Sequence, residues 1–147
     1  MSAAWSGRTS ARDDSGRRRR QIRYAAAALS AATALLYFGI GAGVLKVVDQ
    51  TSADTPNLFE FGALAGAAFV LGTLLLLAFD RRALWLLGAI FQVGVIVMYV
   101  AVSPQRTPPF EQWGILIKVL QIAILAALAW LAVRPRSPRS ASGWRSV

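Results

Sequence analysis

Four long stretches of the chain are almost free of charged residues, and short polar segments separate them. The uncharged stretches cover residues 24–45, 61–79 and 83–105, and a fourth over 112–133 carries the single charge of Lys118. A hydrocarbon core about 30 Å thick requires about 20 helical residues, so each stretch is long enough to cross a bilayer. The pattern predicts an all-α fold: a polytopic membrane protein built as a four-transmembrane-helix bundle. The helices are expected over about 24–48, 60–79, 83–103 and 112–133.

The segments between these stretches are rich in residues that end helices. Residues 49–59 contain Pro56 and Asn57, and residues 104–111 contain three prolines, which cannot continue a helix. Between the second and third stretches only Asp80-Arg81-Arg82 remains, which predicts a tight charged connection.

The two ends of the chain differ from its centre. Residues 1–23 are rich in Ser and Arg, and residues 134–147 in Pro, Ser and Arg. Such segments bury too little apolar surface to fold alone, so both are expected to be disordered basic tails in the cytoplasm. The transmembrane domain then covers residues 24–133.

A basic segment before an apolar run also resembles a signal peptide, and Arg19-Arg20 resembles a twin-arginine signal. However, the run over 24–45 is longer than the usual h-region of about 7–15 residues. It closes on Lys46 and Asp49 without a small-x-small cleavage site. We therefore expect this segment to remain as the first helix.

The charge of the chain determines the predicted orientation. Hydrophobic residues make up 56% of the sequence and charged residues 16%, yet the formal net charge is +9. All Lys and Arg residues except Lys46, Arg106 and Lys118 fall in the tails or in Arg81-Arg82, which four spans place on one side. Positive residues near span ends favour the cytoplasmic side. The sequence thus predicts a multi-pass protein of the cytoplasmic membrane with both termini inside.

The same distribution bears on partners. The basic residues lie in tails next to apolar helices, where orientation during insertion and attraction to anionic lipid headgroups explain them. We therefore expect the lipid bilayer as a partner and no nucleic acid.

The amino-acid composition excludes most classes of enzyme mechanism. The chain has no cysteine and no histidine, which excludes thiol catalysis, thiolate metal sites and imidazole ligation. Only seven Asp and Glu residues remain. We predict no enzyme, no catalytic residues, no cofactor and no bound metal.

Glycines repeat at helical spacing in the first two helices. Gly39 and Gly43 lie four apart in the first, and Gly62 and Gly66 in the second. Small residues at this spacing let helix backbones approach closely in a membrane. The pattern predicts packing of the first helix on the second, and an oligomer seam is the alternative.

Polar residues inside the spans form a second pattern. Glu111, Gly114, Lys118 and Gln121 share one stripe of the fourth helix, and Gln92 lies near the middle of the third. Unpartnered polar groups are unfavourable in lipid, so these stripes should face the bundle interior, where the two glutamines could hydrogen-bond.

This orientation predicts an outward-facing polar pocket around Lys118. Its candidate ligand-binding residues are Lys118, Gln121, Gln92, Glu60, Glu111 and Lys46. Three readings of the lysines stay open: they reach the outer interface and pair with Glu60 or Glu111, they form a ligand or ion site, or one acts as a Schiff-base or proton-transfer group. The aromatic residues near the predicted interfaces fit an aromatic belt: Trp85, Trp113, Trp130, Tyr24 and Tyr99.

Short motifs give a resemblance. Ala42-Gly43-Val44-Leu45-Lys46 ends the first helix, and Gly72-Thr73-Leu74-Leu75-Leu76 precedes Asp80-Arg81-Arg82. Over residues 24–133 the chain resembles the DoxX-like group of small four-helix bacterial membrane proteins. The acidic residue that this group often carries in its second helix has no counterpart within 61–79. The resemblance implies a four-helix membrane fold. The functions of the group are diverse, with some members tied to respiratory or redox membrane complexes, so the resemblance implies little about mechanism.

Two function classes follow from the sequence. The first is a non-enzymatic accessory or assembly partner of a larger membrane complex, which implies a membrane protein partner or a homo-oligomer. The second is a carrier or sensor that binds a small anionic or lipidic ligand at the outer polar pocket. A membrane enzyme ranks third, because Glu60, Glu111 and Lys118 would have to supply all of its acid–base chemistry. High Ala and Arg with scarce Lys indicates a bacterial GC-rich genome.

Overall fold

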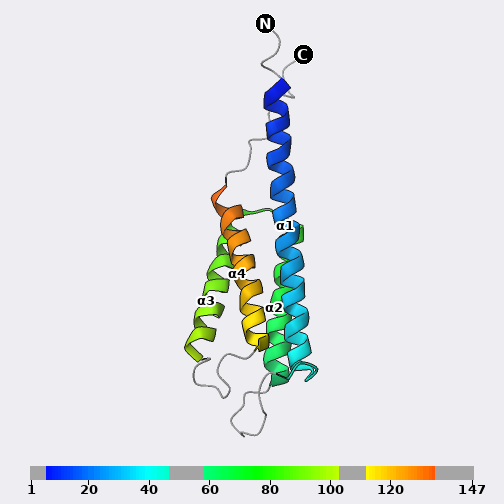
Figure 1. Ribbon diagram of the computed structural model, residues 1–147, viewed down its shortest axis with the longest axis vertical. Helices are drawn as coiled ribbons and strands as arrows, with labels where there is room; N and C mark the ends of the chain where they lie inside the picture. The colour runs from blue at the N-terminus through cyan, green and yellow to red at the C-terminus, as the bar shows by residue number, and fades with distance from the viewer. Residues whose placement is uncertain (1–5, 47–57, 103–111, 135–147) are drawn as a thin grey trace.

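Four helices that run alternately up and down make up the described part of the chain, residues 6–46, 58–102 and 112–134 of a computed structural model. In chain order they are α1 (Ser6–Gly41), α2 (Leu58–Ala78), α3 (Arg82–Val102) and α4 (Gln112–Val133). The N-terminal end of α1 and the C-terminal end of α4 lie at the same end of the molecule (Figure 1). Each helix contains a window long and apolar enough to cross a membrane, as the sequence predicts.

The ends of α2, α3 and α4 agree with the sequence-based boundaries to within two residues, because every proline of the chain lies outside the helices. The first helix differs at both ends. Where a disordered tail was predicted over residues 1–23, α1 is already helical from Ser6 and projects beyond the other helices (Figure 1). No proline interrupts this segment, and extending an existing helix is far easier than nucleating one.

At its other end α1 stops at Gly41 instead of about residue 48. The Gly43 amide donates to the Ile40 carbonyl and the Val44 amide to the Gly39 carbonyl, both at 3.0 Å. With a φ of 71° at Gly43, this is a Schellman motif, in which a left-handed glycine terminates the helix. The predicted packing role of Gly43 is therefore wrong: a Cβ there would meet nothing within 4 Å.

The close contact between α1 and α2 is made by other small residues. A Cβ on Gly62 would lie 2.6 Å from the Gly41 backbone and from the Tyr37 carbonyl oxygen, and one on Gly66 would lie 2.7 Å from the Phe38 ring. Gly62 and Gly66 thus pack against α1 as expected. Gly39 does not face α2, since its nearest neighbour is the Leu45 side chain that follows in the same chain.

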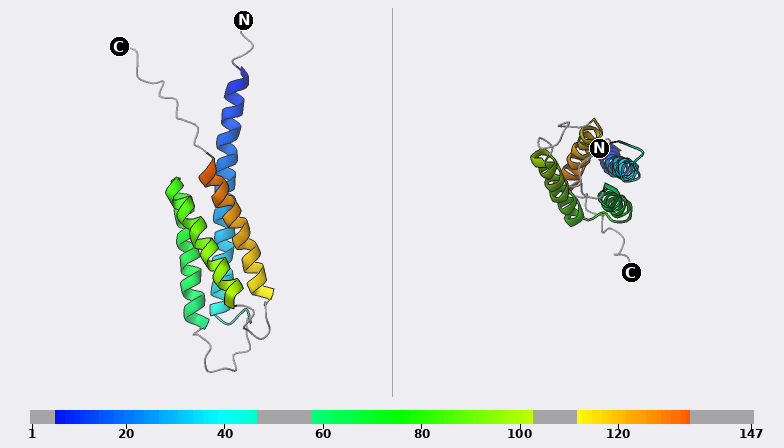
Figure 2. Two further views of the ribbon diagram at one scale, coloured as in Figure 1. Left: turned by 90° about the vertical axis from the view of Figure 1, so that its left-hand side faces the viewer. Right: turned by 90° about the horizontal axis from the view of Figure 1, so that it is seen from below.

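The helices pack in the order α2, α1, α4, α3 around the bundle (Figure 2). α1 packs closely on α2 and on α4, and α3 packs closely on α4. α2 and α3 form no comparable contact, so the bundle is open on the side between them. The buried core is shared by the four helices and includes Ala34, Phe69, Trp85, Ile124 and Leu131.

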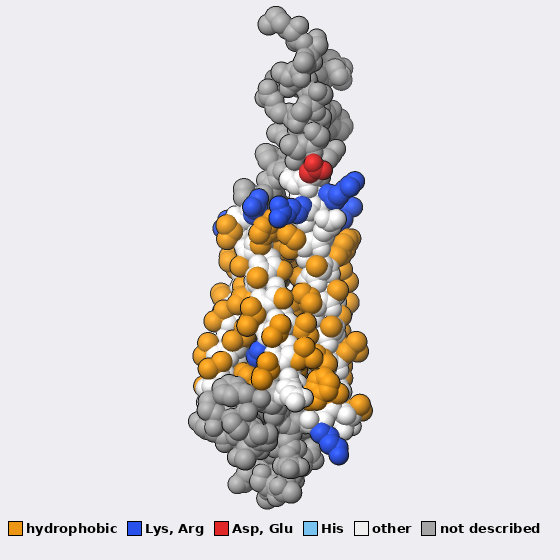
Figure 3. All heavy atoms as spheres, viewed as in Figure 1, with side chains coloured by type: hydrophobic (Ala, Val, Ile, Leu, Met, Phe, Trp, Pro, Cys, Tyr) orange, Lys and Arg blue, Asp and Glu red, His pale blue; other side chains and the backbone are white. Residues whose placement is uncertain are grey.

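The surface divides into an apolar band and a basic end (Figure 3). Large hydrophobic side chains are exposed along α2, α3 and α4, which is the surface expected where helices contact lipid. Lys and Arg side chains gather at the end where α1 projects.

Candidate functional site

Lys118 lies in the second turn of α4 and is held by two groups within the bundle. Its Nζ donates a hydrogen bond to Gln121 Oε1 at 2.6 Å, three residues further along the same helix. The ammonium also lies 4.8 Å from the centre of the Tyr99 ring of α3, which is a cation–π contact. Gly114 makes room for this arrangement, because a Cβ there would lie 2.6 Å from the Tyr99 hydroxyl oxygen.

Gln121 extends the contacts to the first helix. It is fully buried, and its Nε2 donates to the Tyr37 hydroxyl at 3.3 Å. Tyr37 in turn stacks on Phe69 of α2 with ring centres 5.6 Å apart. Lys118, Gln121, Tyr37 and Tyr99, which we name the Lys118 cluster, therefore connect three helices directly and reach the fourth through an aromatic contact.

The remaining predicted site residues lie away from this cluster. The Glu60 and Lys46 side chains are exposed, and among the described residues Glu60 forms no ion pair with Lys118. Glu111 lies outside the described residues. Within the described part of the chain, the Lys118 ammonium thus contacts an amide and an aromatic ring but no carboxylate.

Gln92 is buried as expected but is not hydrogen-bonded to Gln121. Both amide atoms of Gln121 are already engaged, one by Lys118 and the other by Tyr37. Neither amide atom of Gln92 has a hydrogen-bond partner among the described residues. The expected pair of glutamines is therefore replaced by one satisfied and one unsatisfied amide.

Three aromatic residues of the interior were not predicted as part of a site. Tyr37 and Tyr99 belong to the Lys118 cluster, and Trp85 is 1% exposed although an interfacial position was expected. Tyr99 had a usable signal, because it shares a stripe of α3 with Gly88 and Gln92. Trp85 falls seven residues before Gln92 and hence on the same face, which would have indicated an inward position.

A cavity of about 340 Å³ lies between α2 and α3 and reaches α4. Its wall is almost entirely apolar, and Trp85 and Gln92 contribute to it from α3. The Trp85 Nε1 also has no hydrogen-bond partner among the described residues. Trp85 and Gln92, whose buried polar atoms have no hydrogen-bond partner among the described residues, thus both line this cavity on the open side of the bundle.

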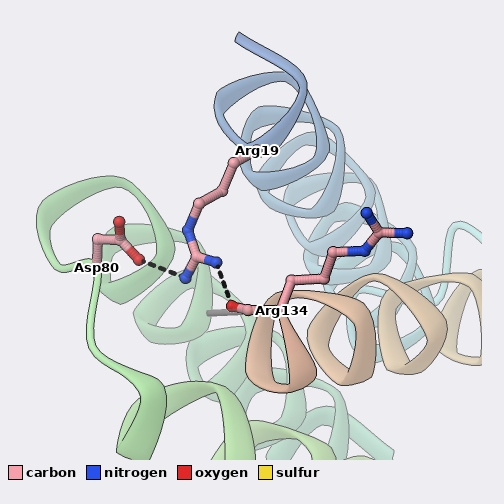
Figure 4. A network of polar contacts seen from close by, with 3 residues as sticks. All are labelled: Arg19, Asp80 and Arg134. Atoms are coloured by element: carbon pink, nitrogen blue, oxygen red, sulfur yellow. Dashed lines mark hydrogen bonds and ion pairs between the residues drawn. The ribbon is translucent and has the colours of Figure 1, made fainter. Parts of the chain in front are cut away.

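The basic end of the bundle has its own polar contacts (Figure 4). Arg19 of α1 donates one hydrogen bond to the Asp80 carboxylate at 3.1 Å and another to the Arg134 carbonyl at 3.0 Å. Arg18 and Arg134 both lie over the Trp130 ring, at 5.8 and 5.0 Å from its centre. These contacts fix the start of α3 and the end of α4 to the long first helix.

No protein-family model, curated protein or solved structure matches this chain. The resemblance to the DoxX-like group therefore rests on its short sequence motifs alone.

Proposed function

We propose that the protein is a multi-pass component of the cytoplasmic membrane with both termini in the cytoplasm. The support is the gathering of Lys and Arg side chains at the end where α1 begins and α4 ends (Figure 3). Positive residues beside span ends favour the cytoplasmic side, and the Arg19 contacts to Asp80 and Arg134 lie at this end as well.

In that membrane we propose a non-enzymatic role as an accessory or assembly partner of a larger complex. The observation that carries this proposal is the outer face of α3. This helix packs closely on α4 alone, and Gly94 lies exposed near its centre with nothing within 4 Å of where a Cβ would be. A glycine inside a helix is less favourable than alanine by about 0.5–1 kcal/mol. A second transmembrane helix that packs closely against Gly94 would account for the glycine at this position, because a small residue lets two helix backbones approach.

Gentle extraction followed by mass spectrometry tests this role. The wild-type protein should copurify with a membrane protein or a second copy, and Gly94→Leu should lose that partner while keeping its helical content and melting temperature. Ala67→Leu is the matched control, because it adds the same bulk to an exposed position of α2. A wild-type protein that runs alone as a monomer would contradict the proposal.

A carrier or sensor that binds an anion at Lys118 is the second candidate. The favouring observation is that the Lys118 ammonium contacts no carboxylate among the described residues. Lys118→Met would then abolish the thermal stabilisation given by an anionic lipid such as lysophosphatidylglycerol, while Lys46→Met, at an exposed position, would not. Equal stabilisation of both variants would assign Lys118 a structural role.

A further inference from the structure

The cavity between α2 and α3 has the size and lining of a ligand site. Its volume of about 340 Å³ falls within the range of small-molecule pockets, about 300–1,000 Å³. Phe69, Phe91 and Trp85 give it aromatic walls, and Gly72 and Gly88 leave space where side chains would otherwise project. Because α2 and α3 do not pack closely, the cavity can be entered from the bilayer.

Of the four buried polar residues of the described bundle, Ser30, Thr33 and Gln121 have hydrogen-bond partners. Ser30 donates to the Phe69 carbonyl at 3.0 Å, Thr33 donates to the Leu29 carbonyl at 2.9 Å, and both amide atoms of Gln121 are engaged. Gln92 departs from this rule, since it is 2% exposed and neither amide atom has a partner among the described residues.

A buried amide without a hydrogen-bond partner is unfavourable, because it has lost its hydration without compensation. Gln92 and the indole Nε1 of Trp85 therefore need partners that the described bundle does not supply, and both residues line the same cavity. The terminal torsion of a glutamine is soft, so the Gln92 amide can turn toward an occupant without moving the helix.

The chemistry of the lining defines that occupant. Among the described residues, no charged side chain lines the cavity, so a charged head group would lose its hydration without compensation. Gln92 offers both a donor and an acceptor, which fits a hydroxyl, and Trp85 offers a further donor, which fits an ester oxygen. The apolar walls fit a hydrocarbon chain.

We propose that the α2–α3 cavity binds a neutral, hydroxyl-bearing lipid whose chain lies against the aromatic walls and whose head group hydrogen-bonds to Gln92 and Trp85. This site is separate from the outer face of α3 and from the Lys118 cluster, and it goes beyond the accessory role. The lipid contributes hydrogen bonds that complete the interior of the protein.

A series of laurate-derived probes tests the proposal on the full-length protein in detergent. Monolaurin carries hydroxyl groups and an ester, methyl laurate only the ester, dodecane neither, and dodecyltrimethylammonium a charge. We expect monolaurin to raise the melting temperature most, methyl laurate less, and the other two least. Binding of monolaurin should be about tenfold weaker in Gln92→Leu, the loss expected for one to two hydrogen bonds.

Two further variants place the site. Gly72→Leu should fill the cavity and abolish the effect of monolaurin, since Gly72 lines the cavity. The substitution should be tolerated, because a Cβ there meets only the Ser30 hydroxyl, at an ordinary 3.5 Å. Ala68→Leu, from the exposed edge of the same wall, should act similarly and serves if Gly72→Leu does not fold. Ala67→Leu, beside it but outside the lining, should bind as the wild type does.

Three outcomes would overturn the proposal. Dodecane as effective as monolaurin would make the cavity an ordinary lipid contact. Stronger stabilisation by the charged probe would refute the neutral head group. Unchanged binding in the folded Gly72→Leu and Ala68→Leu variants would move the site elsewhere. None of these outcomes depends on whether Gly94 binds a partner, so the two proposals fail separately.

Discussion

Gln121 of α4 donates a hydrogen bond to the hydroxyl of Tyr37 in α1 at 3.3 Å, and this bond joins two residues that are 84 positions apart in sequence. The same amide accepts a hydrogen bond from Lys118. Gln92 has the same side chain and nearly the same burial, yet no partner among the described residues. The two glutamines therefore form a natural comparison between a satisfied and an unsatisfied buried amide.

Replacing each glutamine by leucine should change stability in opposite directions. Gln121→Leu removes the hydrogen bonds of the Lys118 ammonium and the Tyr37 hydroxyl to this amide. It should lower the free energy of unfolding by about 2–3 kcal/mol. Gln92→Leu removes two unsatisfied groups and should leave stability unchanged or raise it. Denaturant titration in detergent without added lipid measures both. A similar loss in the two variants would mean that Gln92 is satisfied in the ligand-free protein.

The contact of α1 with α2 should be intolerant of any side chain at Gly62. A Cβ there would lie 2.6 Å from backbone atoms of Gly41 and Tyr37, so the two helices would have to separate. Gly62→Ala should cost several kcal/mol, in line with overpacking of a tight core. Gly94→Ala, in open space, should stabilise the fold by about 0.5–1 kcal/mol. Equal melting temperatures for the two variants would exclude this contact as a determinant of the fold.

Much of this architecture can be predicted from the sequence, because charged residues and prolines mark where the helices end. Long uncharged runs have few ways to satisfy their backbone other than helices. Prolines lie just outside the start of α2, the end of α3 and both ends of α4, and the charged Asp80-Arg81 pair separates α2 from α3. The stripe that contains Lys118 and Gln121 faces inward for a similar reason, since polar groups in lipid need partners.

The sequence alone could not determine which of several possible contacts or roles a residue takes in the folded protein. Gln121 could pair with Gln92 or with Tyr37, and only the relative placement of three helices decides between them. Gly43 fits a packing motif and a helix cap equally well, and the end of α1 at Gly41 makes it a cap. Trp85 fits an interfacial belt and also the face of α3 that carries Gln92, and the packing of α3 on α4 makes it inward.

The cap at Gly43 gives a further prediction. Its φ of 71° is unfavourable for a residue with a Cβ by about 1–2 kcal/mol. Gly43→Ala should therefore destabilise the protein by about this amount, even though the added methyl group has free space. Gly16→Ala is the control, since Gly16 lies inside α1 with ordinary helical geometry and open surroundings, and it should be neutral or stabilising. Thermal unfolding by circular dichroism compares them. A harmless Gly43→Ala would mean that α1 continues past this residue.

The Arg19 contacts should give a salt-dependent contribution at the basic end. Arg19→Ala removes the ion pair with Asp80 and the hydrogen bond to the Arg134 carbonyl, and should lower stability by about 1 kcal/mol, because both contacts are partly solvated. The difference from the wild type should shrink at high salt. Arg20→Ala is the matched control, with an exposed neighbouring arginine. If both variants destabilised the protein equally, the contribution of Arg19 to stability would come from its charge alone and not from its contacts.

The proposed orientation can be tested directly because the chain contains no cysteine, so one introduced thiol is the only reactive thiol. Thr9→Cys lies near the start of α1 in the basic segment, and Ser52→Cys lies between α1 and α2 in the sequence. With both termini in the cytoplasm, a membrane-impermeant maleimide should label Ser52→Cys in intact cells and label Thr9→Cys only after permeabilisation. Normal growth and equal labelling of both variants in detergent serve as controls. The reverse labelling pattern would contradict the orientation drawn from the basic end, because positive charge beside span ends would then face outward.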